Sequence, residues 1–87
     1  MPGVARIGVD AAGGPIIGGG NTRVFANGAP VAVIGDAVVG HGTGPHAGAV
    51  MLGASTRVFA SGKPICRRGD AASCGDMASG SPRVFAS

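Results

Sequence analysis

The chain is built from a short internal repeat. Residues 21–30 read NTRVFANGAP, and residues 55–64 repeat them as STRVFASGKP, 34 positions later (55 − 21 = 34). The first half of this unit occurs a third time, as SPRVFAS, at residues 81–87. Units this short cannot bury an apolar face alone, so they have to pack against one another.

The second half of the unit also occurs three times, but one of its copies opens the chain. A Gly-Asp pair at residues 35–36 returns at 69–70, and residues 3–8 align with residues 64–69. In this opening copy the aspartate, Asp10, comes one residue late. The two terminal segments complete one repeat between them. We therefore expect the three units to close around an axis, with the first and last segments paired. An open stack would leave the surface of each terminal unit uncovered.

Each unit has the pattern of a β-hairpin. Residues 23–26 alternate with a period of two, as do residues 31–34 on the expected return strand. Asn27-Gly28 is a strong signal for a two-residue hairpin turn, and Ser61-Gly62 is a weaker one. The sequence therefore predicts that each unit folds back on itself as two short antiparallel strands.

The segments between the hairpins read as loops. Residues 10–20, 36–53 and 70–80 are rich in Gly, Ala and Pro and have no helical period. Glycine supplies 18 of the 87 residues, and this density disfavours helix throughout. The expected fold is all-β: a small pseudo-threefold cone of short β-hairpins whose long Gly-rich loops converge at the apex.

The chain is long enough for one small domain only. A domain of this size buries about 60–65% of the surface that it exposes when unfolded. Such domains usually need a disulfide, a metal ion or a partner subunit for stability. With two cysteines and no export signal, a reduced pair that binds metal is favoured over a disulfide.

Composition also excludes several classes of partner. The net charge of +3 comes from scattered residues, without the basic cluster and interleaved aromatics of a nucleic-acid binder. No apolar stretch is long enough to span a bilayer, and Arg6 and Asp10 interrupt the region where a secretory signal peptide would lie. We expect a chain made in the cytoplasm without a signal peptide, and no nucleic-acid partner.

The candidate metal ligands are two histidines and two cysteines. His41 lies five residues after Asp36, and Cys74 lies four residues after Asp70, so both occupy nearly the same place in successive units. Loops that converge at one end of an axis would bring these two side chains together, and His46 can fold back onto the same point. Zinc prefers four tetrahedral ligands of this kind. The alternative is a solvated pair of histidines without a metal ion.

The fourth position of such a site is open. The matching place in the first unit, at Gly13 and Gly14, offers no ligand. Cys66 aligns with Ala5 and Ala32, which indicates a buried position where only a small side chain fits. Cys66 is thus a buried thiol or a ligand, with a disulfide to Cys74 as a third reading.

An enzyme is not expected. Three protein ligands and a water are the pattern of a catalytic zinc site, but the chain has no glutamate, and its aspartates lie mainly at the turns of the repeat. Asp36 and Asp70 are expected to stabilise those turns. Exposed arginines recur at 23, 57 and 83, either to discourage edge pairing or as a threefold ring of cations that meets a symmetric partner.

Taken together, the chain resembles the PAAR-repeat proteins over essentially its whole length. The likeness rests on residues 30–36 and 64–70, on the Arg-Val-Phe-Ala hairpins and on the His and Cys loops. The resemblance implies a symmetric β-rich cone with a zinc ion near its apex, typically held by three His and one Cys. His41, His46 and Cys74 match three of those ligands. A glycine replaces the remaining histidine, which leaves Cys66, Asp10 or water for the fourth site.

The resemblance also implies a mechanical function. PAAR-repeat proteins cap a trimeric VgrG-like spike, one tip per trimer, and sharpen it for membrane puncture and effector delivery by a type VI secretion system. We expect residues 1–87 to form a single non-enzymatic domain without an effector extension, secreted at the spike tip by the contractile machine, with any effector as separate cargo. Alternatives are the tip of a phage tail, tailocin or extracellular contractile injection particle, and a small zinc-dependent enzyme.

Overall fold

The computed structural model describes residues 2–18, 21, 23–26, 28–81 and 83–86. Within these residues the fold has three two-stranded antiparallel sheets and one turn of 3-10 helix. The elements are β1 (Ala11–Ala12), β2 (Gly14–Pro15), β3 (Phe25–Ala26), β4 (Ala29–Pro30), η1 (Gly44–Ala47), β5 (Phe59–Ala60) and β6 (Lys63–Pro64). The predicted small all-β fold is confirmed.

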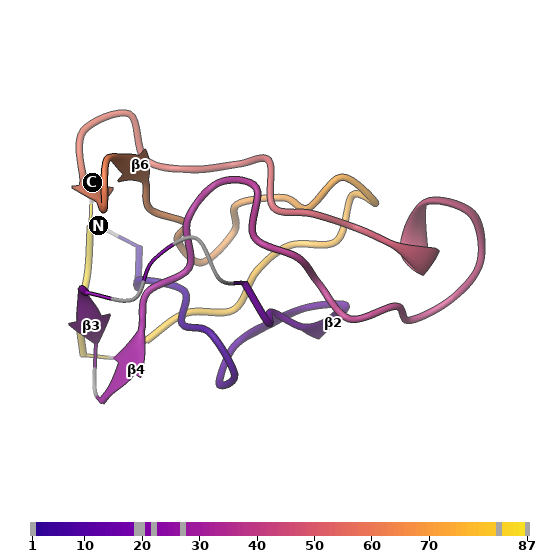
Figure 1. The fold of residues 1–87 in the computed structure, drawn as a ribbon, viewed down its shortest axis with the longest axis horizontal. Helices are drawn as coiled ribbons and strands as arrows, with labels where there is room; N and C mark the ends of the chain where they lie inside the picture. Colours follow the sequence, from indigo (N-terminus) through magenta and orange to yellow (C-terminus); the bar gives the residue numbers. More distant parts are fainter. Residues whose placement is uncertain (1, 19–20, 22, 27, 82, 87) are drawn as a thin grey trace.

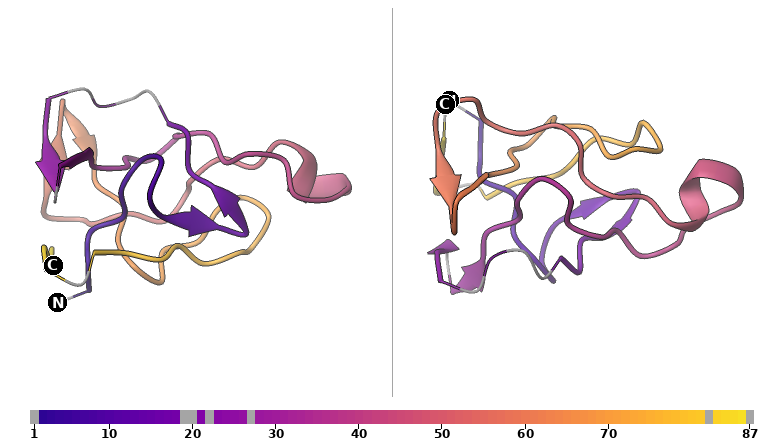
Figure 2. Two further views of the ribbon diagram at one scale, coloured as in Figure 1. Left: turned by 90° about the horizontal axis from the view of Figure 1, so that it is seen from below. Right: turned by 45° about the horizontal axis from the view of Figure 1, so that its top comes forward.

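The molecule is elongated, and its two ends differ. Its extents are 32 × 23 × 20 Å. The β3–β4 and β5–β6 hairpins lie at one end of the long axis together with both chain termini, whereas β2 and the η1 turn lie toward the other end (Figures 1 and 2). We call the end with the hairpins the base and the end with η1 the apex.

Both complete hairpins turn in two residues. In β5–β6, Ala60 pairs with Lys63, and the intervening Ser61 and Gly62 have positive φ angles of 52° and 79°. Two successive positive φ angles are typical of the type I′ turn, whose twist matches that of the strands. In β3–β4, Ala26 pairs with Ala29 around the predicted Asn27-Gly28 turn, of which Asn27 lies outside the described residues.

The first and last segments of the chain pair with each other and take the place of a third hairpin of the repeat. Gly3 and Phe85 make an antiparallel bridge, Val4 N–H donates to the Val84 carbonyl at 2.8 Å, and Ala86 N–H donates to the Pro2 carbonyl at 3.0 Å. The prediction that the first and last segments pair is therefore confirmed.

The pairing of the ends needs glycine on both sides. A Cβ atom at Gly80 would collide with the backbone carbonyl of Gly3, and one at Gly3 would collide with the carbonyl of Ser81. Gly48, in contrast, has no atom within 4 Å of its Cβ position and a φ angle of −156°, which any residue adopts.

We therefore expect Gly80→Ala to lower the free energy of unfolding by about 1–3 kcal/mol, because backbone atoms cannot swing aside as a flexible side chain can. Gly48→Ala is the matched control and should change it by less than about 0.5 kcal/mol. Urea denaturation of the two variants measures both values. Equal stability of the two variants would contradict the close approach of the ends.

Three central segments close a ring of backbone hydrogen bonds. Ala5 N–H donates to the Cys66 carbonyl at 3.0 Å, Cys66 N–H to the Ala32 carbonyl at 2.8 Å, and Ala32 N–H to the Ala5 carbonyl at 2.8 Å. All three residues are fully buried and belong to one hydrophobic cluster. The ring is the structural core of the threefold repeat, and it explains why only small side chains occupy these positions.

The central segments contribute residues to two hydrophobic clusters. Val31 and Val33 point into a cluster with residues of the base, whereas Ala32 between them belongs to the cluster that reaches toward the apex. The predicted alternation of residues 31–34 is present up to Val33. Both faces of this segment are buried, however, because Val31 and Val33 belong to one hydrophobic cluster and Ala32 belongs to the other.

A polar side chain at the start of each hairpin fixes its backbone. Ser55 Oγ accepts the N–H groups of Arg57 and Val58, each at 3.0 Å, and Ser81 does the same for Arg83 and Val84. In the first unit this place is taken by Asn21. The repeat thus includes a side-chain turn that the sequence pattern alone does not identify.

Asn21 binds the backbone through both polar atoms of its side chain. Its Oδ1 accepts the N–H groups of Arg23 and Val24 at 3.0 and 3.1 Å, and its Nδ2 donates to the carbonyls of Val24 and Val31 at 2.7 and 3.2 Å. The residue is only 1% exposed. Replacing it with a side chain that cannot hydrogen-bond leaves buried backbone groups without partners.

Asn21→Ala should therefore lower the free energy of unfolding by about 1–3 kcal/mol. Asn21→Ser should recover a substantial part of the loss, because serine performs the same capping in the other two units. Thermal and chemical denaturation of both variants tests this expectation. A serine variant as unstable as the alanine variant would show that the oxygen acceptor is not what stabilises the turn.

Aspartates brace the turn that follows each central segment. The carboxylates of Asp10, Asp36 and Asp70 accept the N–H groups of Arg6, Val33 and Arg67 at 2.8–2.9 Å. Asp10 and Asp70 also form ion pairs with Arg6 and Arg67, at 2.8 and 2.9 Å. The predicted role of Asp36 and Asp70 in stabilising turns is confirmed.

The η1 turn departs from the expectation of a loop without helix. It lies in the loop between the second and third units and carries a proline in its first turn, where the missing N–H costs nothing. Four residues are a common length for such a 3-10 turn. None of the helical segments in the described part of the chain has the length and apolar character required to cross a bilayer.

Candidate metal centre

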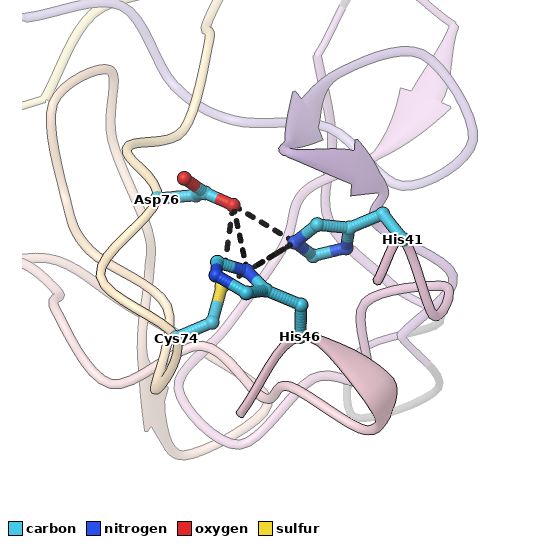
Figure 3. Close-up of side chains that lie close together, drawn as sticks. All are labelled: His41, His46, Cys74 and Asp76. Atoms are coloured by element: carbon cyan, nitrogen blue, oxygen red, sulfur yellow. Dashed lines mark hydrogen bonds and ion pairs between the residues drawn. The ribbon is translucent and has the colours of Figure 1, made fainter. Parts of the chain in front are cut away.

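Two loops near the apex bring four possible ligands together. His41 and His46 come from the loop that contains η1, and Cys74 and Asp76 come from the loop that follows Asp70 (Figure 3). One ligand atom from each residue lies within 4.8 Å of the other three. Three of the four residues are those that the sequence predicts, and Asp76 is an addition.

Short turns position both pairs of side chains. His41 N–H donates to the His46 carbonyl at 2.9 Å, which closes the loop around η1 and sets the two rings in an edge-to-face contact with centroids 5.0 Å apart. In the other loop, Ala72 N–H donates to the Asp76 carbonyl at 2.9 Å, and Gly75 has a φ angle of 91°. This tight turn directs Cys74 and Asp76 toward the histidines.

The distances between ligand atoms suit a tetrahedral ion. His41 Nε2 lies 2.8 Å from Asp76 Oδ2, 3.1 Å from His46 Nδ1 and 3.5 Å from Cys74 Sγ. Asp76 Oδ2 lies 3.3 Å from His46 Nδ1 and 3.5 Å from Cys74 Sγ. Zinc bonds of about 2.0–2.3 Å set tetrahedral ligand atoms about 3.3–3.8 Å apart. Small outward movements would make room for an ion between them.

A hydrogen bond orients the ring of His41. Its Nδ1 donates to the Val39 carbonyl at 2.9 Å, so Nε2 is the nitrogen that faces the other three side chains. Ligating histidines typically use such a second partner to fix the tautomer and the direction of the ring. The backbone next to His41 thus presents its free nitrogen to the site.

The electrostatics of the four side chains are coupled. The hydrogen bond to Val39 raises the pKa of His41; burial opposes this effect, and Asp76 adds to it. Hydrogen bonds from His41 and then from Cys74 lower the pKa of Asp76, which favours the carboxylate. Because histidine binds metal in its neutral form, a metal ion at this site competes with a proton for His41 Nε2.

The structure explains the glycine at the position of the missing histidine. A Cβ atom at Gly13 would collide with Asp76 Oδ2 and His41 Nε2, and Gly13 has a φ angle of 84°. A Cβ atom at the neighbouring Gly14 would collide with the carbonyl of Val39. Asp76 therefore occupies the space that a side chain from the first loop would need.

The other candidates for the fourth ligand lie elsewhere. Cys66 is part of the central ring, outside the group of four, and burial raises the pKa of its thiol to about 12. Both cysteines are free thiols, so the disulfide between Cys66 and Cys74 is not formed. Asp10 is 5% exposed, and its oxygens accept hydrogen bonds from Arg6 and Ser79.

One sequence signal could have identified Asp76. The other three aspartates follow the repeat, because each closes the turn after a central segment. Asp76 has no counterpart in the other units and lies two residues after a predicted ligand. An acidic residue that breaks a repeat next to a ligand is a candidate for the same site.

The geometry suits metal binding better than nucleophilic catalysis. In a Cys-His-Asp relay, the thiol and the carboxylate contact different nitrogens of the imidazole. Here Cys74 and Asp76 both approach Nε2 of His41, and Nδ1 is engaged by the backbone. The described residues also enclose no pocket for a small-molecule substrate.

Comparison with known proteins assigns the chain to a family. A search among curated proteins finds no match to the chain. The family model described as PAAR motif matches residues 9–79, which include two of the three hairpins and all four residues of the candidate centre. Because this match covers most of the sequence, the chain belongs to the PAAR motif family.

Proposed function

We propose that the chain is the non-enzymatic tip of a type VI secretion spike, where one copy caps a trimeric VgrG-like protein. PAAR motif proteins are spike-tip proteins of contractile injection systems, which supports the general assignment. The observation that carries the proposal further is the arrangement of the base, where three equivalent hairpins present aromatic side chains to solvent.

The aromatic residues of the base lie at equivalent positions. Phe25, Phe59 and Phe85 are 56%, 56% and 48% exposed. Large apolar side chains that recur at one end of a molecule mark a surface for a protein partner. A threefold set of contacts on one chain matches the end of a trimer, because each protomer can then make the same contact.

The apex serves the mechanical part of the function. The cluster of His41, His46, Cys74 and Asp76 offers two imidazoles, one thiolate and one carboxylate, a set that suits zinc. A structural zinc ion stabilises the folded state by an amount that depends on its free concentration, about 4 kcal/mol at a thousand times its dissociation constant. It would hold the apical loops together while the tip pierces the membrane of a target cell.

In this proposal the chain delivers effectors without acting on a substrate. It leaves the cell on the spike, which also carries the effector cargo. The same cap would serve a phage tail, a tailocin or an extracellular injection particle, and the spike that it binds identifies the machine. Four protein ligands would also leave no open position for the water of a catalytic zinc site.

Co-expression with a trimeric VgrG-like spike tests the proposal. A complex of one chain per trimer, measured by native mass spectrometry, is the expected result. Metal analysis of the same complex should give one zinc ion per chain. A chain that stays monomeric beside folded spike trimers, at every salt concentration tried, would overturn the assignment.

A further inference from the structure

The charges of the chain are unevenly distributed between the base and the remainder. The hairpin segments, residues 21–30, 55–64 and 81–87, contain Arg23, Arg57, Lys63 and Arg83 and no acidic residue. The remainder has three arginines and all four aspartates. The net charge of +3 is therefore +4 in the hairpin segments and −1 elsewhere (4 − 1 = 3).

Two of the three arginines outside the hairpin segments have carboxylate partners, and the third, Arg68, is exposed. Arg6 and Arg67 form ion pairs with Asp10 and Asp70. Arg23, Arg57 and Arg83 are exposed, and within the described part of the chain no carboxylate pairs with them. Among the described residues, the arginines of the base thus have no paired carboxylate, although the chain contains four aspartates.

The backbone places these three arginines equivalently. In each unit the N–H group of the arginine is bound by the capping side chain, Asn21, Ser55 or Ser81, at 3.0 Å. Each arginine also lies two residues before an exposed phenylalanine. Every hairpin therefore presents the same pair of features, one cation and one aromatic ring.

We propose that the base recognises a trimeric end face that carries carboxylates around an apolar centre. This inference rests on the proposed function and specifies the chemistry of its partner. Burying guanidinium groups against a neutral surface would cost more desolvation energy than it returns. Opposite charges on the partner offset this cost, set the rotational register of the tip and speed the encounter of the two proteins.

The test uses a trimeric β-helical spike fragment with acidic residues on its end face, together with a version in which they are changed to Asn or Gln. Binding is followed by biolayer interferometry at low and high salt. The association rate of the wild-type chain with the acidic fragment should fall about tenfold or more between about 50 and 500 mM NaCl.

Variants of the chain distinguish the contribution of charge to binding from the contribution of apolar packing. The triple variant Arg23→Gln, Arg57→Gln, Arg83→Gln should associate slowly at both salt concentrations, and so should the wild-type chain with the neutralised fragment. Arg68→Gln is the matched control, because Arg68 is exposed but lies outside the hairpins. It should behave as the wild type.

Three results would overturn the inference. In the first, the wild-type chain and the triple variant bind the acidic fragment alike, without dependence on salt; the spike-tip function would then stand. In the second, the triple variant loses binding only to duplex DNA or to anionic vesicles, which would assign the cations to another partner. In the third, no chain binds either fragment at any salt, and the proposed function fails as well.

Discussion

A chelator is expected to lower the melting temperature of the chain, loaded with zinc at the proposed site, by about 15–30 °C. Zinc at about a thousand times its dissociation constant stabilises the folded state by about 4 kcal/mol. Each kcal/mol shifts the melting temperature of a domain this small by about 4–8 °C. Differential scanning calorimetry before and after chelation, followed by addition of zinc, measures the loss and its reversal.

Substitutions locate the metal within the chain. Cys74→Ala and Asp76→Ala should each purify with much less than one zinc ion per chain and melt close to the temperature of the stripped protein. Cys66→Ala is the matched control, because alanine occupies the equivalent positions 5 and 32 of the central ring. It should retain its zinc. Loss of zinc in Cys66→Ala with full occupancy in Cys74→Ala would place the metal site elsewhere.

Replacing the three phenylalanines of the base should abolish capping. We expect the triple variant Phe25→Ser, Phe59→Ser, Phe85→Ser to bind a VgrG-like trimer at least about 100-fold more weakly, since a few buried aromatic anchors dominate the energy of most interfaces. Fold and zinc content should be unchanged, because these side chains are about half exposed. Titration calorimetry with the purified trimer measures the loss.

An equally apolar set of residues outside the base serves as the control. Val9, Leu52 and Met77 are 58%, 57% and 63% exposed and lie outside the hairpin segments. Changing all three to serine removes a similar apolar area and should leave capping intact. If this variant loses capping and the phenylalanine variant does not, the trimer binds a different face of the chain.

Much of the architecture follows from the repeat in the sequence. The copies predict the hairpins, and their division between the two ends predicts the bridge between Gly3 and Phe85. The shared position of His41 and Cys74 in successive units predicts that their loops meet, and Nε2 and Sγ are 3.5 Å apart. The repeat makes these features predictable, because what the sequence indicates for one unit applies to the other two.

Features that break the symmetry, or that depend on the path of the backbone, are harder to predict from the sequence. Asp76 has no counterpart in the other units. That it takes the place of a missing side chain is evident only from the structure, where a Cβ atom at Gly13 would collide with Asp76 Oδ2. The capping by Asn21 and its serine counterparts depends on the path of the backbone, which spacing does not give. The central ring likewise joins Ala5, Ala32 and Cys66 through main-chain atoms, which any residue type possesses.

The bond between Ala86 and Pro2 has a consequence for the order of the chain. It corresponds to the pairing of Ala26 with Ala29 and of Ala60 with Lys63, so the gap between the ends lies where the other units have a two-residue turn. A circular permutant of residues 1–87 that is opened at residues 61–62 and joined from residue 87 to residue 1 should therefore keep every strand pairing. The order in which the three units follow one another along the chain is then free to begin at any of the three turns.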